Sequence, residues 1–220
     1  MTGVYLEIGK RKVFACATDW PGWARAGRKE DAALSALTAA APRFAVVCAR
    51  AGLPFDGPSA VAHFEIVERV AGSATTDFGA LDVCAELDRA PLTRQDAGRL
   101  AALVEAAWNV FSRAASAAPP ALRKGPRGGG RDRDAIVDHV LQTEVLHARM
   151  LGLPHRPFPP ADTAAAARVR ADILAAILAG EASGQPGPAR GTRPRRFVAR
   201  RTAWHALDHA WEIQDRQDPA

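Results

Sequence analysis

The sequence predicts an α+β fold in which a small α/β-type unit, a strand hairpin plus a helix, is followed by a bundle of four helices. Short runs rich in β-branched and aromatic residues occur near the start of the chain. From about residue 91 onward, apolar residues instead recur at spacings of three and four, which is the period of a helix. With 48% hydrophobic and 24% charged residues, the 220-residue chain can build one large or two small cores. We therefore expect two domains, residues 1–90 and residues 91–220.

The N-terminal elements follow from local patterns. The runs "VYLEIG" and "KVFACATDW" are separated by "KRK" and closed by Pro21 and Gly22, which is typical of a β-hairpin that ends in a turn. Residues 29–52 predict a helix that begins with Glu30 and Asp31, where the helix dipole favours acidic groups, and that Pro42 interrupts. The stretch "AHFEIVERVAG" predicts one or two further strands.

Four amphipathic segments make up the second part. Each opens with a residue suited to a helix N-terminus: Thr93, Asp132, Asp162 and Pro194. The first three segments end at Pro119-Pro120, Gly152 and Gly180. Helices with one apolar face must pack against one another, and an antiparallel up-down-up-down bundle is the simplest arrangement.

The net charge of +5 lies entirely in the second part of the chain. Residues 1–90 hold ten Lys/Arg and eleven Asp/Glu, whereas residues 91–220 hold nineteen and thirteen. The excess is concentrated in "LRKGPRGGGRDR" (122–133) and "RGTRPRRFVARR" (190–201). Such runs are most often solvated loops and helix starts, and the scarcity of lysine beside abundant alanine reflects genome composition. Nucleic acid is therefore not the expected partner.

Composition also bears on the compartment. Three cysteines in separate apolar contexts indicate neither a disulfide framework nor a thiolate metal site. No signal-peptide pattern and no apolar run of 18 residues occurs, so we expect no membrane association. The sequence predicts a cytoplasmic protein.

A histidine pair in "TAWHALDHAWEIQDR" indicates a metal site. His205 and His209 are four residues apart, so they share a helical face at roughly 5–6 Å between Cβ atoms and can bind one ion. His139 lies about seven residues from its helix start and His205 about eleven. If the second and fourth helices are parallel, both therefore lie roughly 10–17 Å from the same end of the bundle and the three imidazoles can converge. Three imidazoles leave an open coordination position, as in catalytic metal sites.

Other residues compete for these roles. Glu144 and His147 are alternative third ligands, although His147 lies about 12 Å beyond His139 along the helix, too deep to share the level of His205. Asp208 and Glu212 are candidate outer-shell partners that would orient an imidazole through its second nitrogen. Alternatively, one or more of the histidines only pack or cap against their helix neighbours.

The arginines suggest an anionic substrate. Both basic runs immediately precede a histidine helix, so parallel helices would gather them into a collar at one end of the bundle. We expect Arg127, Arg131, Arg196 and Arg200 to bind a small anionic molecule there, helped by the helix N-termini.

His139 together with "HALDH" in the last helix resembles the DinB/YfiT-like metalloprotein superfamily, over about residues 91–216. The resemblance implies a four-helix bundle and a divalent ion, zinc or nickel in many members, held by three histidines. It also implies chemistry with low-molecular-weight thiols. The resulting hypothesis is a metal-dependent transferase or hydrolase that acts on a small anionic substrate.

The segment "VYLEIGKRKVFACATDWPGWARAGRKEDAALSAL" is similar to the HicB-like domain, over about residues 3–50. The matching positions are Pro21, Gly22, Gly27, Glu30 and Ala33. This resemblance implies a partial ribonuclease-H-like unit used for protein interaction, so residues 1–50 are a possible site for a protein partner. The alternative hypothesis for the whole chain is therefore a non-catalytic binding or regulatory module. Trp20 and Trp23 either pack on the bundle or form an exposed contact patch.

Overall fold

The computed structural model describes residues 1–125, 129–179 and 191–217, and its fold is mixed α+β. A sheet of four strands forms the N-terminal part, in the order β3-β2-β1-β4. The strands are β1 (Thr2–Ile8), β2 (Val13–Ala17), β3 (Ala24–Gly27) and β4 (Phe64–Ala71). The predicted hairpin is confirmed, because β1 and β2 pair in antiparallel fashion. β4 pairs with β1 in parallel. The four-residue strand β3 was not expected, because the pattern after the Pro21-Gly22 turn is too short to be recognised.

Side chains alternate between the two faces of the sheet, and both faces carry buried residues in β1 and β2. Val4 and Leu6 belong to the same apolar cluster as α1 (Glu30–Ala39) and α2 (Ala41–Arg50). Tyr5 and Phe14 belong to a second cluster on the opposite face, which includes Trp204 from the last helix. The Phe14 and Trp204 rings meet edge to face at 5.6 Å. The sheet is therefore held between the first two helices and the last one.

The helix predicted for residues 29–52 is broken where expected. α1 and α2 meet at Ala40 with a bend of 51°, and Pro42 lies in the first turn of α2, where its missing N–H is tolerated. No single helix in the described ranges is long and apolar enough to cross a membrane. The bent pair α1–α2 reaches that length and apolar character only when its two helices are taken together.

The two tryptophans near the first turn pack inside the protein. Trp23 is fully buried and its ring stacks on Phe44 of α2 at 5.7 Å. Trp20 is half-buried, meets Phe55 at 4.9 Å and lies under the Arg99 guanidinium of α4 at 4.2 Å. They therefore form no exposed patch, and a partner of residues 1–50 would have to use other surfaces.

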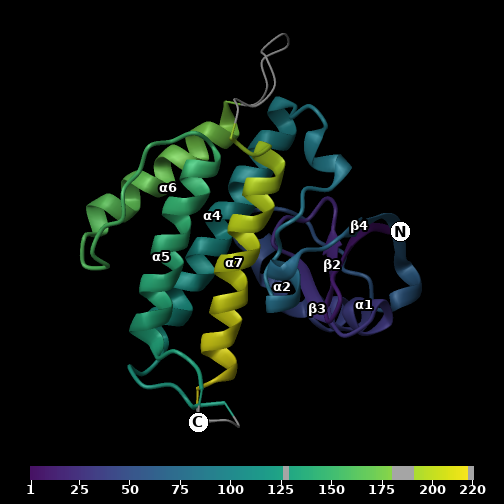
Figure 1. Ribbon diagram of the computed structural model, residues 1–220, viewed down its shortest axis with the longest axis horizontal. Helices are drawn as coiled ribbons and strands as arrows, with labels where there is room; N and C mark the ends of the chain where they lie inside the picture. The colour runs from purple at the N-terminus through teal and green to yellow at the C-terminus, as the bar shows by residue number, and fades with distance from the viewer. Residues whose placement is uncertain (126–128, 180–190, 218–220) are drawn as a thin grey trace.

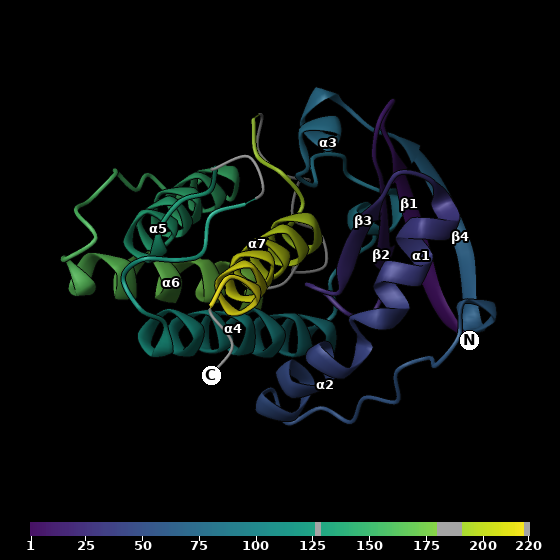
Figure 2. The same ribbon diagram turned by 90° about the horizontal axis from the view of Figure 1, so that it is seen from below.

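Four long helices follow a short one, α3 (Ala74–Phe78). They are α4 (Arg94–Ala117), α5 (Arg133–Met150), α6 (Thr163–Leu178) and α7 (Arg195–Asp215). Two expected caps are confirmed, because the Thr93 hydroxyl accepts from the Asp96 N–H at 3.1 Å and the Asp162 carboxylate from the Ala165 N–H at 2.8 Å. Figures 1 and 2 show α7 between the sheet on one side and α5 on the other.

The helix directions differ from the expected up-down-up-down order. The N–H of Arg193, just before α7, donates to the carbonyl of Met150 at the end of α5 at 2.8 Å. At the other end, the N–H of Arg123 donates to the carbonyl of Arg216 just after α7 at 2.9 Å. α5 and α7 are therefore antiparallel, and the expectation of parallel second and fourth helices is wrong.

The connection between α5 and α6 explains this difference. The Gln142 amide donates to the Phe158 carbonyl and the Arg149 guanidinium to the His155 carbonyl, each at 2.8 Å, so residues 151–162 run back along α5. α6 consequently starts beside the middle of α5 and runs toward the same end of the structure as α5 (Figure 1).

A continuous apolar core links the two parts of the chain. One cluster of buried side chains runs from β1 and β2 through α1 and α2 into all four long helices. The division into domains at residue 90 stays a prediction. Cys16 and Cys48 are buried and Cys84 is half-buried, and all three thiols are free.

Candidate metal centre

Three histidines predicted as ligands converge between α5 and α7. One ring nitrogen from each of His139, His205 and His209 lies within 4.8 Å of the others. The Nε2 atoms of His139 and His205 are 3.2 Å apart. The ring centroids are separated by 5.0, 5.0 and 4.6 Å. The fold thus brings one imidazole from α5 to two imidazoles from α7.

The antiparallel helices place these residues opposite one another. His139 is the seventh residue of α5, counted from Arg133, and His209 is the seventh from the end of α7, counted back from Asp215. His205 lies one turn from His209 on the same face of α7. The meeting of the three imidazoles therefore follows from antiparallel packing and not from the parallel packing expected from the sequence.

The protein environment keeps two of these imidazoles neutral. Burial lowers the pKa of His205 well below its ordinary value, and the neighbouring His209 adds to this effect. Burial also lowers the pKa of His139, and its electrostatic interactions with His209 and Arg131 add to this effect. Neutral imidazole is the form that binds a metal ion, so the site needs little proton release before it can accept one.

A carboxylate orients the third imidazole. His209 Nδ1 donates to Glu212 Oε2 at 2.8 Å, and Glu212 Oε1 accepts from Arg216 Nη1 at 2.6 Å. The hydrogen bond from His209 is the largest factor that lowers the pKa of Glu212. With Nδ1 protonated, His209 presents the lone pair of Nε2. Asp208 has a different role, since its carboxylate accepts from Arg25 of β3 at 2.9 Å.

The alternative ligands, Glu144 and His147, make hydrogen bonds to other residues. Both Glu144 carboxylate oxygens accept from Arg170 of α6 at 2.9 Å. His147 is buried, its Nδ1 is 3.0 Å from the Thr202 hydroxyl, and its ring lies 6.0 Å from that of His205. The expectation that His147 lies too deep to reach the level of His205 is therefore wrong, because α7 runs in the opposite direction.

The second nitrogen of His147 is distinctive. Its Nε2 is buried without a hydrogen-bond partner among the described residues. Burial lowers its pKa to about 3. Thr202, which fixes the ring, was not recognised from the sequence, although it lies three residues before His205 on the same helical face.

The four predicted anion-binding arginines are not gathered at one end. Arg127 lies outside the described residues. Arg131 is exposed and close enough to His139 to influence its pKa. Arg196 pairs with Asp96 at 2.7 Å, and Arg200 is buried in an ion pair with Asp88. The expected common collar is wrong, because α5 and α7 start at opposite ends. Anion binding by these residues stays a prediction.

No protein-family model, curated protein or solved structure matches this chain. Its chemistry must therefore be inferred from the geometry of its own residues. Three nitrogen donors, at least two of them held neutral by burial and one oriented by a carboxylate, form a set able to hold a cation.

Proposed function

We propose that α4–α7 form a metal-binding bundle of the DinB/YfiT-like kind, in which His139, His205 and His209 hold a divalent ion. The observation that carries this proposal is the approach of the three ligand nitrogens to within 4.8 Å. Imidazole suits zinc and nickel among the divalent metals, and these are the ions we expect. The resemblance of "HALDH" and His139 to that superfamily supports the same assignment.

The donor set fits a metal ion better than internal packing. Two Nε2 atoms at 3.2 Å satisfy each other only when one of them carries a proton, and the third imidazole then still has an unused lone pair. A cation would be bound by all three lone pairs together. The Glu212 bond at the far side of His209 is the outer-shell contact common at metal-bound imidazoles.

We propose a metal-dependent transferase or hydrolase activity on a small anionic substrate, such as a low-molecular-weight thiol. A divalent ion held by the three imidazoles would lower the pKa of a bound water molecule or thiol. The chain's own residues would position the site: Glu212 fixes His209, and the exposed Arg131 beside His139 attracts anions.

Metal content of the untagged protein tests the proposal. The protein should be purified without chelators and its bound metals measured by mass spectrometry, beside a His205→Ala/His209→Ala variant. We expect about one equivalent of zinc or nickel in the wild type and almost none in the variant. A His63→Ala/His155→Ala variant is the matched control, since it removes two histidines outside the site and should keep its metal. A folded wild-type protein that binds no ion, even after zinc or nickel is added, contradicts the proposal.

A further inference from the structure

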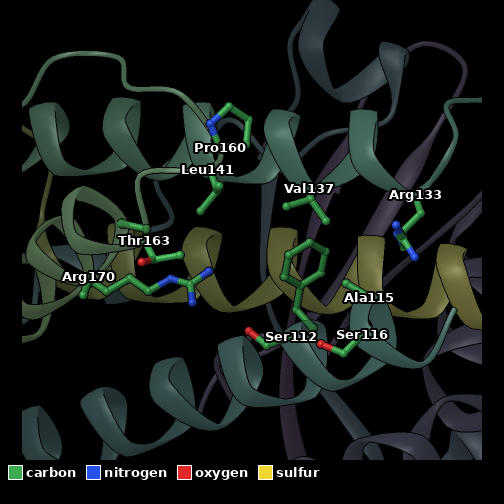
Figure 3. A pocket seen from close by; sticks show the side chains of 12 residues that line it. Ser112, Ala115, Ser116, Arg133, Val137, Leu141, Pro160, Thr163 and Arg170 are labelled. Atoms are coloured by element: carbon green, nitrogen blue, oxygen red, sulfur yellow. The ribbon is translucent and has the colours of Figure 1, made fainter. Parts of the chain in front are cut away.

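A second site lies on the other side of α5 from the histidines. A cavity of about 760 Å³ opens between α4, α5 and α6. Val137 and Leu141 of α5 line it, whereas His139, midway between them in sequence, faces α7. Figure 3 shows Arg133 and Arg170 at opposite ends of this cavity, with Val137 and Leu141 between them.

Small residues on the two flanking helices create the cavity. Its walls carry serine, alanine and threonine side chains, which leave space that larger residues would fill: Ser112, Ala115, Ser116, Thr163, Ala166 and Ala167. The apolar lining includes Phe111 and Leu141, which are both buried. Apolar side chains between two arginines at opposite ends suit a hydrocarbon chain with a charged end, and the volume lies within the range of small-molecule sites.

The two ends of the cavity differ in charge. At one end, Arg170 donates from Nε and Nη2 to the buried carboxylate of Glu144, so this pair is neutral as a whole. At the other end, Arg133 donates from Nη1 to the carbonyl of Ala118 and from Nε to Asp134, a side chain that is 77% exposed. A water-exposed carboxylate screens its partner only weakly, so the Arg133 end stays positive. Arg133 is also the first residue of α5, where the helix dipole adds positive potential.

We propose that this cavity binds a medium-chain aliphatic carboxylate, with the carboxylate at Arg133 and the chain along Val137 and Leu141. One positive end calls for one carboxylate. The far end is lined by Arg170, whose guanidinium already holds the Glu144 carboxylate, so it offers no free charge to a second carboxylate. The site uses none of the histidines, so it stands whether or not the protein binds a metal.

Calorimetric titration with octanoate tests the ligand class. We expect one octanoate per chain. 1-Octanol, which has the same chain without the charge, should bind about tenfold more weakly or worse, as expected from the loss of a charge-assisted hydrogen bond. Octanedioate should bind no more tightly than octanoate, because the Arg170 guanidinium at the far end is already paired with Glu144. Absence of octanoate binding, or equal affinity for octanoate and octanol, overturns the proposal.

Two pairs of variants locate the ligand. Arg133→Gln should weaken octanoate binding about tenfold or more, whereas Arg113→Gln, an exposed arginine of α4 outside the cavity, should not change it. Ala166→Leu fills the cavity and should abolish binding, whereas Ala164→Leu, exposed on the same helix and outside the cavity, should not. Far-ultraviolet circular dichroism confirms that each variant is folded. Unchanged octanoate affinity in both Arg133→Gln and folded Ala166→Leu shows that the ligand binds elsewhere and contradicts the assignment.

Discussion

On the side of α7 that packs against the sheet, charged groups meet opposite charges. Arg200 pairs with Asp88 and lies 4.6 Å over the Tyr5 ring, and Asp208 accepts from Arg25 at 2.9 Å. On the side that faces α5, His205 and His209 instead meet another histidine, with no carboxylate between the rings. One side of α7 therefore makes contacts between opposite charges, and the other side makes contacts between side chains of the same kind.

This difference separates a structural contact from a candidate site. Opposite charges held together across an interface satisfy each other and fix the position of the sheet on α7. Three imidazoles that share a small volume do not satisfy one another and would repel if protonated. The first arrangement balances its charges within the protein, whereas the second brings together three nitrogens that could hold a cation. Substitutions on the sheet side of α7 should consequently change mainly the free energy of unfolding, and substitutions on the α5 side mainly the binding of zinc.

The largest effect on stability is expected on the sheet side. Asp88→Ala leaves the Arg200 guanidinium buried without its carboxylate, which should lower the free energy of unfolding by about 3–5 kcal/mol. Urea denaturation followed by circular dichroism measures this change. Glu86→Ala is the control, because it breaks the exposed pair with Arg89 and should cost less than about 1 kcal/mol. Equal effects of the two substitutions would remove the claimed contrast between buried and exposed pairs.

Zinc should stabilise the protein only through the histidines on the side of α7 that faces α5. At a free concentration of a hundred times Kd, bound zinc should raise the free energy of unfolding of the wild type by about 2.7 kcal/mol. His205→Ala should lose most of this gain, since it removes one of the three converging imidazoles. Denaturation with and without zinc measures the difference. An equal gain in wild type and variant would place the zinc at another site.

The Glu212–His209 contact should tune metal affinity. Glu212→Gln replaces the charged acceptor of the His209 Nδ1 proton and should weaken zinc binding by about 10- to 100-fold. Competition with a chromophoric chelator measures the affinity. Asp208→Asn is the matched control, because this neighbouring carboxylate belongs to the sheet side and should leave the zinc affinity unchanged. A larger loss in Asp208→Asn than in Glu212→Gln would reverse the proposed roles.

The smallest effect is expected at Thr202. Thr202→Val removes the hydroxyl that bonds to His147 Nδ1 and should cost about 1 kcal/mol of unfolding free energy. Its zinc affinity should match that of the wild type, because His147 lies outside the group of three converging nitrogens. A His147→Gln variant that lost zinc as completely as His139→Ala would instead make His147 a ligand.

Local patterns predicted much of the fold. The helix caps at Thr93 and Asp162 and the break near Pro42 depend on residues close in sequence, and all three are confirmed. The pairing of His205 with His209 likewise needs only the helical repeat. The short strand β3 escaped prediction because four residues carry too little pattern.

Contacts between distant residues could not be predicted in the same way. Arg25 and Asp208 are separated by 183 residues, and no local pattern connects them. The direction of α7 relative to α5 depends on residues 151–162, which return along α5 through single side-chain contacts to backbone carbonyls. His139 nevertheless lies beside His205 and His209 in the antiparallel arrangement, because His139 and His209 are equally far from opposite helix ends.

X-ray absorption at the zinc edge tests the central claim most directly. Zinc bound to the wild-type protein should show three imidazole nitrogens at about 2.0–2.1 Å, and this signature should disappear in the His205→Ala/His209→Ala variant. A spectrum with one imidazole or none, or the same spectrum in wild type and variant, would contradict a metal centre between α5 and α7.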